Sequence, residues 1–213
     1  MQSGEFKLPL VDTINTSLRR LPTWVVYILC ALPAPWLFYL GVSGGLGVEP
    51  IKALEHELGL LALQFLIAGL AITPLRRVVG LNLIKFRRAI GLLTFYYVVC
   101  HLLVWLFLDV QIVSEIWADI IKRPYVTVGM LGFVLMVPLA VTSNNWSVRK
   151  LGPRWRSLHK VVYLIAVLGA LHFIMLTKGF QLEPLIYMAV ILGLLALRLP
   201  KKRLPRSVQD QSA

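Results

Sequence analysis

Charged residues are scarce in this chain. Asp, Glu, Lys and Arg make up 15% of the 213 residues, hydrophobic residues make up 58%, and the mean hydropathy is +0.75. Ordinary soluble domains have about 25% charged residues. The shortage excludes a typical water-soluble globular domain and predicts that the lipid bilayer is the main solvent of this protein.

Cysteines and common catalytic motifs are also few or missing. Cys30 and Cys100 fall in apolar segments at different expected depths, which argues against a disulfide. No Cys-x-x-Cys-His motif is present, which excludes covalent haem attachment by that motif, and there is no P-loop. His56-Glu57 begins like a zinc-protease motif, but Leu60 stands at the position of the second histidine. The sequence therefore shows no hydrolytic or nucleotide-binding site of these classes.

Six apolar segments approach the length of about 20 residues that crosses a bilayer. They are residues 22–41, 58–74, 89–108, 125–142, 158–176 and 184–199. The loops between them have at most roughly 16 residues, too short for a soluble domain of about 50 residues or more. The predicted fold is an all-α integral membrane protein, a six-transmembrane-helix bundle over residues 22–199. Residues 1–21 and the basic residues 200–213 flank this bundle.

The first apolar segment follows Arg19 and Arg20, as the core of a signal peptide would. It is longer than a typical signal core and lacks a clear cleavage pattern, so we expect a retained helix. Pro33 and Pro35 lie inside this segment. Because proline removes a backbone donor, they predict a kink.

Basic residues are concentrated in alternate loops. The loops after the second and fourth segments, and the tail, contain Arg76, Arg77, Lys85, Arg87, Arg88, Arg149, Lys150, Arg154, Arg156, Arg198, Lys201, Lys202, Arg203 and Arg206. Because Lys and Arg stay on the cytoplasmic side, both termini are predicted to be cytoplasmic. This topology accounts for the net charge of +12, so no nucleic-acid partner is expected.

Histidines are few, and their positions carry the functional prediction. An ionisable side chain at membrane depth is a functional candidate, because burying it costs free energy. His101 and His172 fall in the third and fifth segments, which run in the same direction, so both are expected in the outer half of the bilayer. Two neutral imidazoles at one depth can bind a haem iron from opposite faces. The alternative for each histidine is a hydrogen bond to a neighbouring helix.

His159 lies 13 residues before His172, a rise of about 20 Å that would suit a second haem in the inner half. The same spacing turns the two side chains about 140° apart on an ideal helix. No second histidine is expected at that depth. The alternative is a hydrogen-bonded interfacial residue beside Trp155 and Lys160.

Five separated segments resemble one family of membrane proteins. They are residues 44–50 (GGLGVEP), 72–75 (ITPL), 86–92 (FRRAIGL), 123–129 (RPYVTVG) and 151–160 (LGPRWRSLHK). In this order, around the three segment histidines, they resemble the haem-binding membrane subunits of bacterial periplasmic methionine sulfoxide reductase systems. That family is similar to the membrane domain of ferric reductases and NADPH oxidases.

The resemblance implies an inner-membrane electron-transfer subunit without a catalytic site of its own. It implies one or two b-type haems on His101, His172 and His159, and a flavin mononucleotide. Electrons would come from the quinone pool or a cytoplasmic flavin reductase. They would pass to a periplasmic molybdopterin-containing methionine sulfoxide reductase subunit that repairs oxidised proteins. Arg87, Arg88, Arg154 and Arg156 would contact the flavin phosphate, because guanidinium groups match phosphate oxygens, although topology alone also explains these arginines.

Two features depart from the oxidases. Arg88 stands 13 residues before His101, where the oxidases carry a second histidine. A guanidinium group cannot replace imidazole as an iron ligand, which puts an inner bis-histidine haem in doubt. The short tail after Leu199 leaves no room for a flavin and nicotinamide domain, so a separate electron donor is expected.

Two other functions compete with electron transfer. A transporter or proton channel could use His101, His159 and His172 as a relay. The segments show no acidic residue in their cores, no paired broken helices and no obvious inverted repeat, which argues against this reading. A structural anchor for a periplasmic enzyme would leave the segment histidines unexplained.

Overall fold

The computed structural model describes residues 9–177 and 179–198, and every regular element in these ranges is helical. The α-helices are α1 (Pro9–Arg20), α2 (Thr23–Ala31), α3 (Pro33–Ser43), α4 (Pro50–Val78), α5 (Arg87–Val104), α6 (Val113–Lys122), α7 (Pro124–Val141), α8 (Asn145–Leu151), α9 (Pro153–Leu158), α10 (Val162–Leu176) and α11 (Leu182–Ala196). Short 3₁₀ turns cover Ile84–Phe86 and His159–Val161, and a π-helical turn, Trp105–Val110, extends α5. The all-α fold class is confirmed. The predicted basic tail, residues 200–213, lies outside the described residues.

Five helical stretches among the described residues are long and apolar enough to cross a membrane. They are Thr23–Ser43, Pro50–Val78, Ile84–Val110, Pro124–Val141 and Pro153–Leu176. The chain is therefore a multi-pass membrane protein. The sixth apolar helix, α11, has 15 residues, which corresponds to about 22 Å at 1.5 Å per residue. This length is short of the hydrocarbon core, and the predicted end of the sixth span at Leu199 lies outside the described residues. Six spans therefore stay a prediction.

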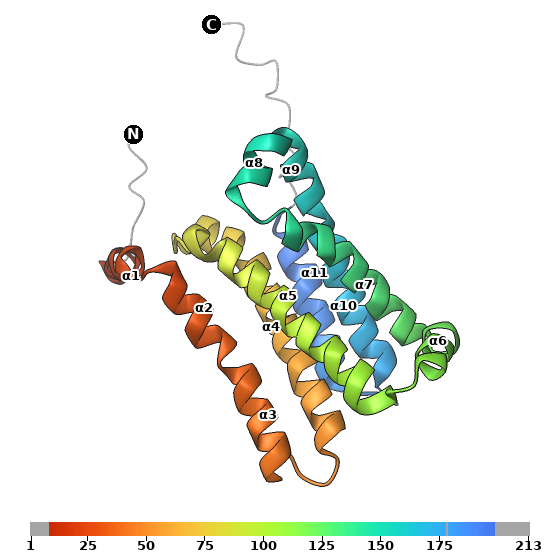
Figure 1. Ribbon diagram of the computed structural model, residues 1–213. Helices are drawn as coiled ribbons and strands as arrows, with labels where there is room; N and C mark the ends of the chain where they lie inside the picture. The colour runs from red at the N-terminus through yellow and green to blue at the C-terminus, as the bar shows by residue number, and fades with distance from the viewer. Residues whose placement is uncertain (1–8, 178, 199–213) are drawn as a thin grey trace, which may run out of the picture.

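The bundle has two distinct ends in Figure 1. The helices α4, α5, α7, α10 and α11 run alongside one another, and α2 with α3 leans against α4 and α5. The short helices α1, α8 and α9 lie at one end, and α6 lies at the other. The end with α1 also carries the basic residues Arg76 and Arg77 of α4, Arg87 and Arg88 of α5, Arg149 of α8, and Arg154 and Arg156 of α9. This arrangement is what an alternating topology requires, and the side of the membrane that each end faces stays a prediction.

The first span is kinked at the predicted prolines. α2 ends at Ala31 and α3 begins at Pro33, while Leu32 between them keeps right-handed helical angles, φ −57° and ψ −34°. The chain therefore continues as a bent helix. Figure 1 shows α2 and α3 as one leaning rod on the outside of the bundle.

The second span begins earlier than the sequence predicted. α4 starts at Pro50, whereas the apolar pattern placed the start at Leu58. Proline at the first position of a helix has its backbone angle already set and has no amide hydrogen to leave unpaired. The helix therefore carries Glu55 and His56 past the apolar segment, and this extension supplies part of the candidate site.

The short helices α1, α6, α8 and α9 were not predicted, because each is too short to span the bilayer. α1 packs on the connection between α4 and α5 through Asn15. The Asn15 side chain donates a hydrogen bond from Nδ2 to Gly80 O at 3.1 Å and accepts one at Oδ1 from Asn82 N at 2.9 Å. The Lys85 ammonium donates to Arg19 O at 2.8 Å and to Leu21 O at 2.6 Å, and it thereby caps the end of α1. α6 crosses the opposite end of the bundle (Figure 1).

The buried core joins four of the long helices. Its members are Leu63, Leu66 and Leu70 of α4, Met136 and Leu139 of α7, Ile165, Ala166, Ala170 and Phe173 of α10, and Ile191 of α11. Large apolar side chains also cover the outside of the bundle, such as Val134 at 58% and Leu192 at 50% exposure. An apolar exterior around an apolar core is expected when lipid replaces water as the solvent.

Arg198 compensates for a proline inside α4. Pro74 has no amide hydrogen, so the carbonyl of Leu70 lacks its normal helical donor. The Arg198 guanidinium donates to Leu70 O and, at 3.0 Å, to the hydroxyl of Tyr163. Arg198, two residues after the end of α11, is therefore tied to both α4 and α10.

Candidate functional site

His101 of α5 and His172 of α10 face each other across the bundle. Their ring centroids are 6.2 Å apart, and the ring planes are 85° to each other. They are separated by 71 residues of sequence, yet they come to one depth because α5 and α10 run in the same direction. The structure thus brings together the two histidines that the sequence placed at matching depth.

Each of these imidazoles is held by a backbone carbonyl of a different helix. His101 Nδ1 lies 2.8 Å from the carbonyl oxygen of Glu55 in α4, and His172 Nδ1 lies 2.7 Å from that of Tyr125 in α7. A carbonyl oxygen can only accept a hydrogen bond, so each Nδ1 carries the proton. The lone pair of each neutral ring is then on Nε2, which is the tautomer that a metal ligand needs.

The two rings line a cavity of about 540 Å³ between α4, α5, α7 and α10. This volume is in the range of pockets that hold small molecules and cofactors, about 300–1,000 Å³. Deep in the bundle the walls are apolar, with Leu66, Val98, Phe133, Met136 and Ile165. An apolar cavity of this kind excludes water from anything bound between the rings.

The end of the cavity nearest α6 is polar. Lys52, Glu55 and His56 of α4 line it, together with Asp109 and Arg123. His56 is half-exposed there and packs edge-on against Phe173, with 5.8 Å between the ring centroids. The sequence analysis gave His56 no place in a site, because the second apolar segment was predicted to begin after it.

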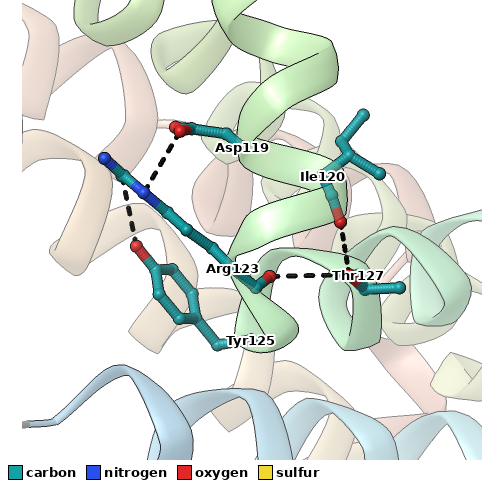
Figure 2. A network of polar contacts seen from close by, with 5 residues as sticks. All are labelled: Asp119, Ile120, Arg123, Tyr125 and Thr127. Carbon is teal, nitrogen blue, oxygen red and sulfur yellow. Dashed lines mark hydrogen bonds and ion pairs between the residues drawn. The ribbon is translucent and has the colours of Figure 1, made fainter.

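A polar network ties α6 to α7, the helix whose Tyr125 carbonyl binds His172 (Figure 2). Arg123 pairs with Asp119, Nε to Oδ1 at 3.1 Å, and donates to the Tyr125 hydroxyl at 3.3 Å. Thr127 donates to the carbonyl oxygens of Ile120 and Arg123. The hydrogen bond with Tyr125 raises the pKa of the Arg123 guanidinium, so this group stays positively charged. The network fixes the first turn of α7, whose Tyr125 carbonyl binds His172.

His159 does not line this cavity. It lies in the 3₁₀ turn before α10, with Nδ1 at 3.1 Å from Trp155 O and its ring stacked on Trp155 at 3.8 Å. Its Nε2 is buried and has no hydrogen-bond partner within the described residues. Arg88, the residue that replaces the second histidine of the oxidases, is exposed in the first turn of α5.

The four arginines predicted for a flavin phosphate lie at the end of the bundle away from α6. Arg87 and Arg88 begin α5, Arg154 and Arg156 lie in α9, and all four side chains are exposed. Figure 1 shows the start of α5 and α9 at the same end of the bundle. None of these arginines lines the histidine cavity.

The histidine pair fits a metal held by a macrocycle. No group of three His, Cys, Asp or Glu side chains that could hold an ion occurs in the described residues, so His101 and His172 would supply only two ligands. Their ring centroids are 6.2 Å apart and an imidazole nitrogen binds a first-row metal at about 2 Å, so both rings could reach one metal ion between them.

Known proteins match the chain over most of its length. Residues 56–170 match the ferric reductase like transmembrane component family. A protein-methionine-sulfoxide reductase heme-binding subunit MsrQ from Brucella anthropi is 51% identical over 177 residues, which are 83% of this chain and 80% of the relative. Proteins of the same name are 49% identical in Agrobacterium fabrum, over 83% of this chain and 82% of the relative, and in Brucella ovis, over 84% and 81%. No solved structure matches the chain.

The family match contains His101, His159 and Tyr125 and ends two residues before His172, and the longer matches extend over most of the described helices. More than half of the chain is covered by the family and more than four fifths by relatives at about 50% identity. The chain therefore belongs to the ferric reductase like transmembrane family and, within it, to the MsrQ family of heme-binding subunits.

Proposed function

We propose that this chain is a haem b-containing subunit of the bacterial inner membrane that carries electrons to a periplasmic methionine sulfoxide reductase. The observation that carries the proposal is the pair of neutral imidazoles, each with Nδ1–H bonded to a carbonyl and both lining one apolar cavity. A proton relay could use the same tautomers, so the cavity of about 540 Å³ between the rings is what favours a bound cofactor. The names of the relatives, which specify heme binding, agree with this chemistry.

His101 and His172 are the residues that would hold the haem iron. When bound, the haem supplies an iron that gains and loses one electron without leaving the protein. The chain itself orients the imidazoles, excludes water from the apolar part of the cavity and places cations at its mouth. Lys52 and Arg123 at that mouth suit the carboxylates of a b-type haem, since a guanidinium forms charge-assisted hydrogen bonds with carboxylates.

The proposed partners lie on opposite sides of the membrane. A periplasmic molybdopterin-containing reductase subunit would take electrons at the end with α6, which is the end the cavity approaches. A quinone or a cytoplasmic flavin reductase would supply them at the end with α8 and α9. The grouping of Arg87, Arg88, Arg154 and Arg156 at that end supports a flavin mononucleotide there, and the unpartnered Nε2 of His159 supports a second haem site.

Haem spectroscopy of the purified protein tests the ligand assignment. We expect a b-type reduced-minus-oxidised spectrum from the wild-type chain in detergent, and a haem count from a pyridine haemochrome assay. His101→Ala and His172→Ala should each remove the haem, because only one of the two imidazoles that would hold the iron remains. His56→Ala is the matched control, because its side chain is half-exposed at the mouth, and it should retain the haem.

Two outcomes would contradict the proposal. A full haem complement in both His101→Ala and His172→Ala would disprove the ligand assignment. A folded wild-type chain without any haem would favour the relay of a transporter or proton channel. A stoichiometry of two haems, with one lost in His159→Ala, would support the second site.

A further inference from the structure

Two glycines lie directly against the two imidazoles of the site. A Cβ atom on Gly59 of α4 would lie 3.1 Å from His101 Nδ1 and 3.3 Å from its Cε1. A Cβ atom on Gly129 of α7 would lie 2.8 Å from His172 Nδ1 and 3.0 Å from its Cε1. Contacts below 3.0 Å essentially never occur for real Cβ atoms, and those between 3.0 and 3.4 Å are rare. Any side chain at position 59 or 129 would therefore push the neighbouring ring away from the helix.

Each glycine shares its helix face with the carbonyl that binds the same ring. Glu55 O and Gly59 are four residues apart in α4, and Tyr125 O and Gly129 are four residues apart in α7. Residues four apart lie on one face of an α-helix. The carbonyl accepts a hydrogen bond from Nδ1–H, while the glycine one turn later, which has no Cβ, leaves room for the ring edge. The same pairing of a carbonyl acceptor with a glycine four residues later thus occurs twice, in α4 and in α7, two of the four helices that form the cavity wall.

We propose that Gly59 and Gly129 are positioning residues that set the depth and orientation of the two imidazoles toward the iron. The proposal rests on the proposed function, in which His101 and His172 bind haem. An alanine at either position displaces the ring and lengthens its Nδ1–H···O=C bond. That hydrogen bond fixes the tautomer and the basicity of the ligand, and loss of such partners typically weakens metal binding about 10- to 100-fold.

Close packing alone does not require these glycines. Gly132, one turn beyond Gly129 in α7, also lines the cavity, but a Cβ there would meet only Leu168 Cβ at 3.9 Å. Gly69 of α4 would place a Cβ 3.5 Å from Ile90, and Gly91 of α5 would meet nothing within 4 Å. An added methyl group is therefore tolerated at other helical glycines of the same bundle, and the two tight contacts found at helical glycines of the described residues are both with imidazole rings.

Four single substitutions test the proposal. Gly59→Ala and Gly129→Ala are compared with Gly69→Ala on α4 and Gly91→Ala on α5, the two matched controls. The measurements are the rate of haem transfer from each purified variant to excess apomyoglobin, the low-spin ferric electron paramagnetic resonance spectrum, and the midpoint potential. A stability effect alone would not move the resonance signal of the haem that remains bound.

We expect Gly129→Ala to lose haem about 10-fold or more faster than the wild type, because its contact is the shorter of the two. Gly59→Ala should retain more haem, with a shifted resonance spectrum and midpoint potential. Gly69→Ala and Gly91→Ala should match the wild type in all three measurements. If Gly129→Ala yields no folded protein, the measurements on Gly59→Ala test the proposal by themselves. That variant is expected to fold, since its contact of 3.1 Å requires the His101 ring to shift by only a few tenths of an ångström.

The failures of the two proposals differ in these measurements. A wild-type chain that binds haem, with Gly59→Ala indistinguishable from Gly69→Ala in transfer rate, spectrum and potential, would overturn the positioning role and leave the proposed function standing. A folded wild-type chain without haem would overturn the proposed function itself.

Discussion

At the scale of single residues, one hydroxyl group joins the kinked first span to the rest of the bundle. The Tyr97 side chain is fully buried, its ring stacks on Phe65 at 5.3 Å, and its hydroxyl donates to Cys30 O at 2.7 Å. We predict that Tyr97→Phe destabilises the protein by about 1–2 kcal/mol, because the Cys30 carbonyl loses its donor in an apolar setting. Thermal unfolding in detergent should show a lower Tm.

Tyr39→Phe is the control for this prediction, since Tyr39 is 60% exposed on α3. The ring and its stacking are kept in both variants, so a difference between them reports the buried hydroxyl. Equal Tm values for Tyr97→Phe, Tyr39→Phe and the wild type would show that this hydrogen bond does not hold the first span.

The charge at the cavity mouth makes a second prediction at this scale. Arg123 lines the mouth, and Asp119 and Tyr125 hold its guanidinium in place (Figure 2). A cation near the iron favours the reduced form, so Arg123→Gln should lower the midpoint potential, on the order of tens of millivolts. Lys122→Gln is the control, because this substitution removes the same charge from a neighbouring residue that does not line this cavity. A redox titration that gives an unchanged or raised potential for Arg123→Gln would contradict the prediction.

What the sequence reveals about the site depends on the distance between partners. The matching depth of His101 and His172 follows from the hydrophobic pattern and the alternation of spans, and the structure places the two rings together. The acceptors of their Nδ1 protons lie 46 and 47 residues away, at Glu55 and Tyr125. Backbone carbonyls carry no residue signature, so neither these bonds nor the roles of Gly59 and Gly129 could be predicted from the sequence.

At the scale of elements, the tie between Arg198 and α4 makes a third prediction. Arg198→Ala leaves Leu70 O without a donor, because Pro74 offers no amide hydrogen. We expect a loss of about 1–3 kcal/mol in the free energy of unfolding, the cost of an unpaired buried polar group. Pro74→Ala supplies the missing amide hydrogen within the helix, so it should recover part of that loss in the double variant.

A double-mutant cycle of Arg198→Ala and Pro74→Ala, followed by thermal unfolding, measures this coupling. Additive effects of the two changes would show that Arg198 stabilises α11 through Tyr163 alone, to which it donates at 3.0 Å.

Amphipathic elements limit what the hydrophobic pattern can predict at this scale. The long apolar runs located α4, α5, α7 and α10, since about 20 apolar residues have few other structures in a bilayer. α1 and α6 were missed because they are short and half polar, which is also typical of loops. α6 nevertheless contributes to the site, because its Asp119 holds Arg123 and its Ile120 carbonyl binds Thr127 in the first turn of α7.

At the scale of the whole molecule, the orientation in the membrane remains the prediction with the widest consequences. The end with α1, α8 and α9 carries the arginines at the end of α4, at the start of α5 and in α8 and α9. Lys and Arg are retained on the cytoplasmic side of a membrane. The cavity mouth with Arg123 would then face the periplasm, next to the proposed reductase partner. An inverted orientation would deliver electrons to the wrong compartment, so the proposed function depends on this point.

Cysteine labelling in intact cells can determine the orientation. Val48 is fully exposed in the loop between α3 and α4, and Ser157 is exposed in α9 at the opposite end of the bundle. In a chain with Cys30 and Cys100 replaced by Ala, we expect a membrane-impermeant maleimide to label Val48→Cys in intact cells and Ser157→Cys only after the membrane is permeabilised. Gln181→Cys, exposed before α11, should behave like Val48→Cys because α10 returns the chain to that side. The reverse pattern would place the haem edge toward the cytoplasm, and the periplasmic reductase could then not be the direct electron acceptor.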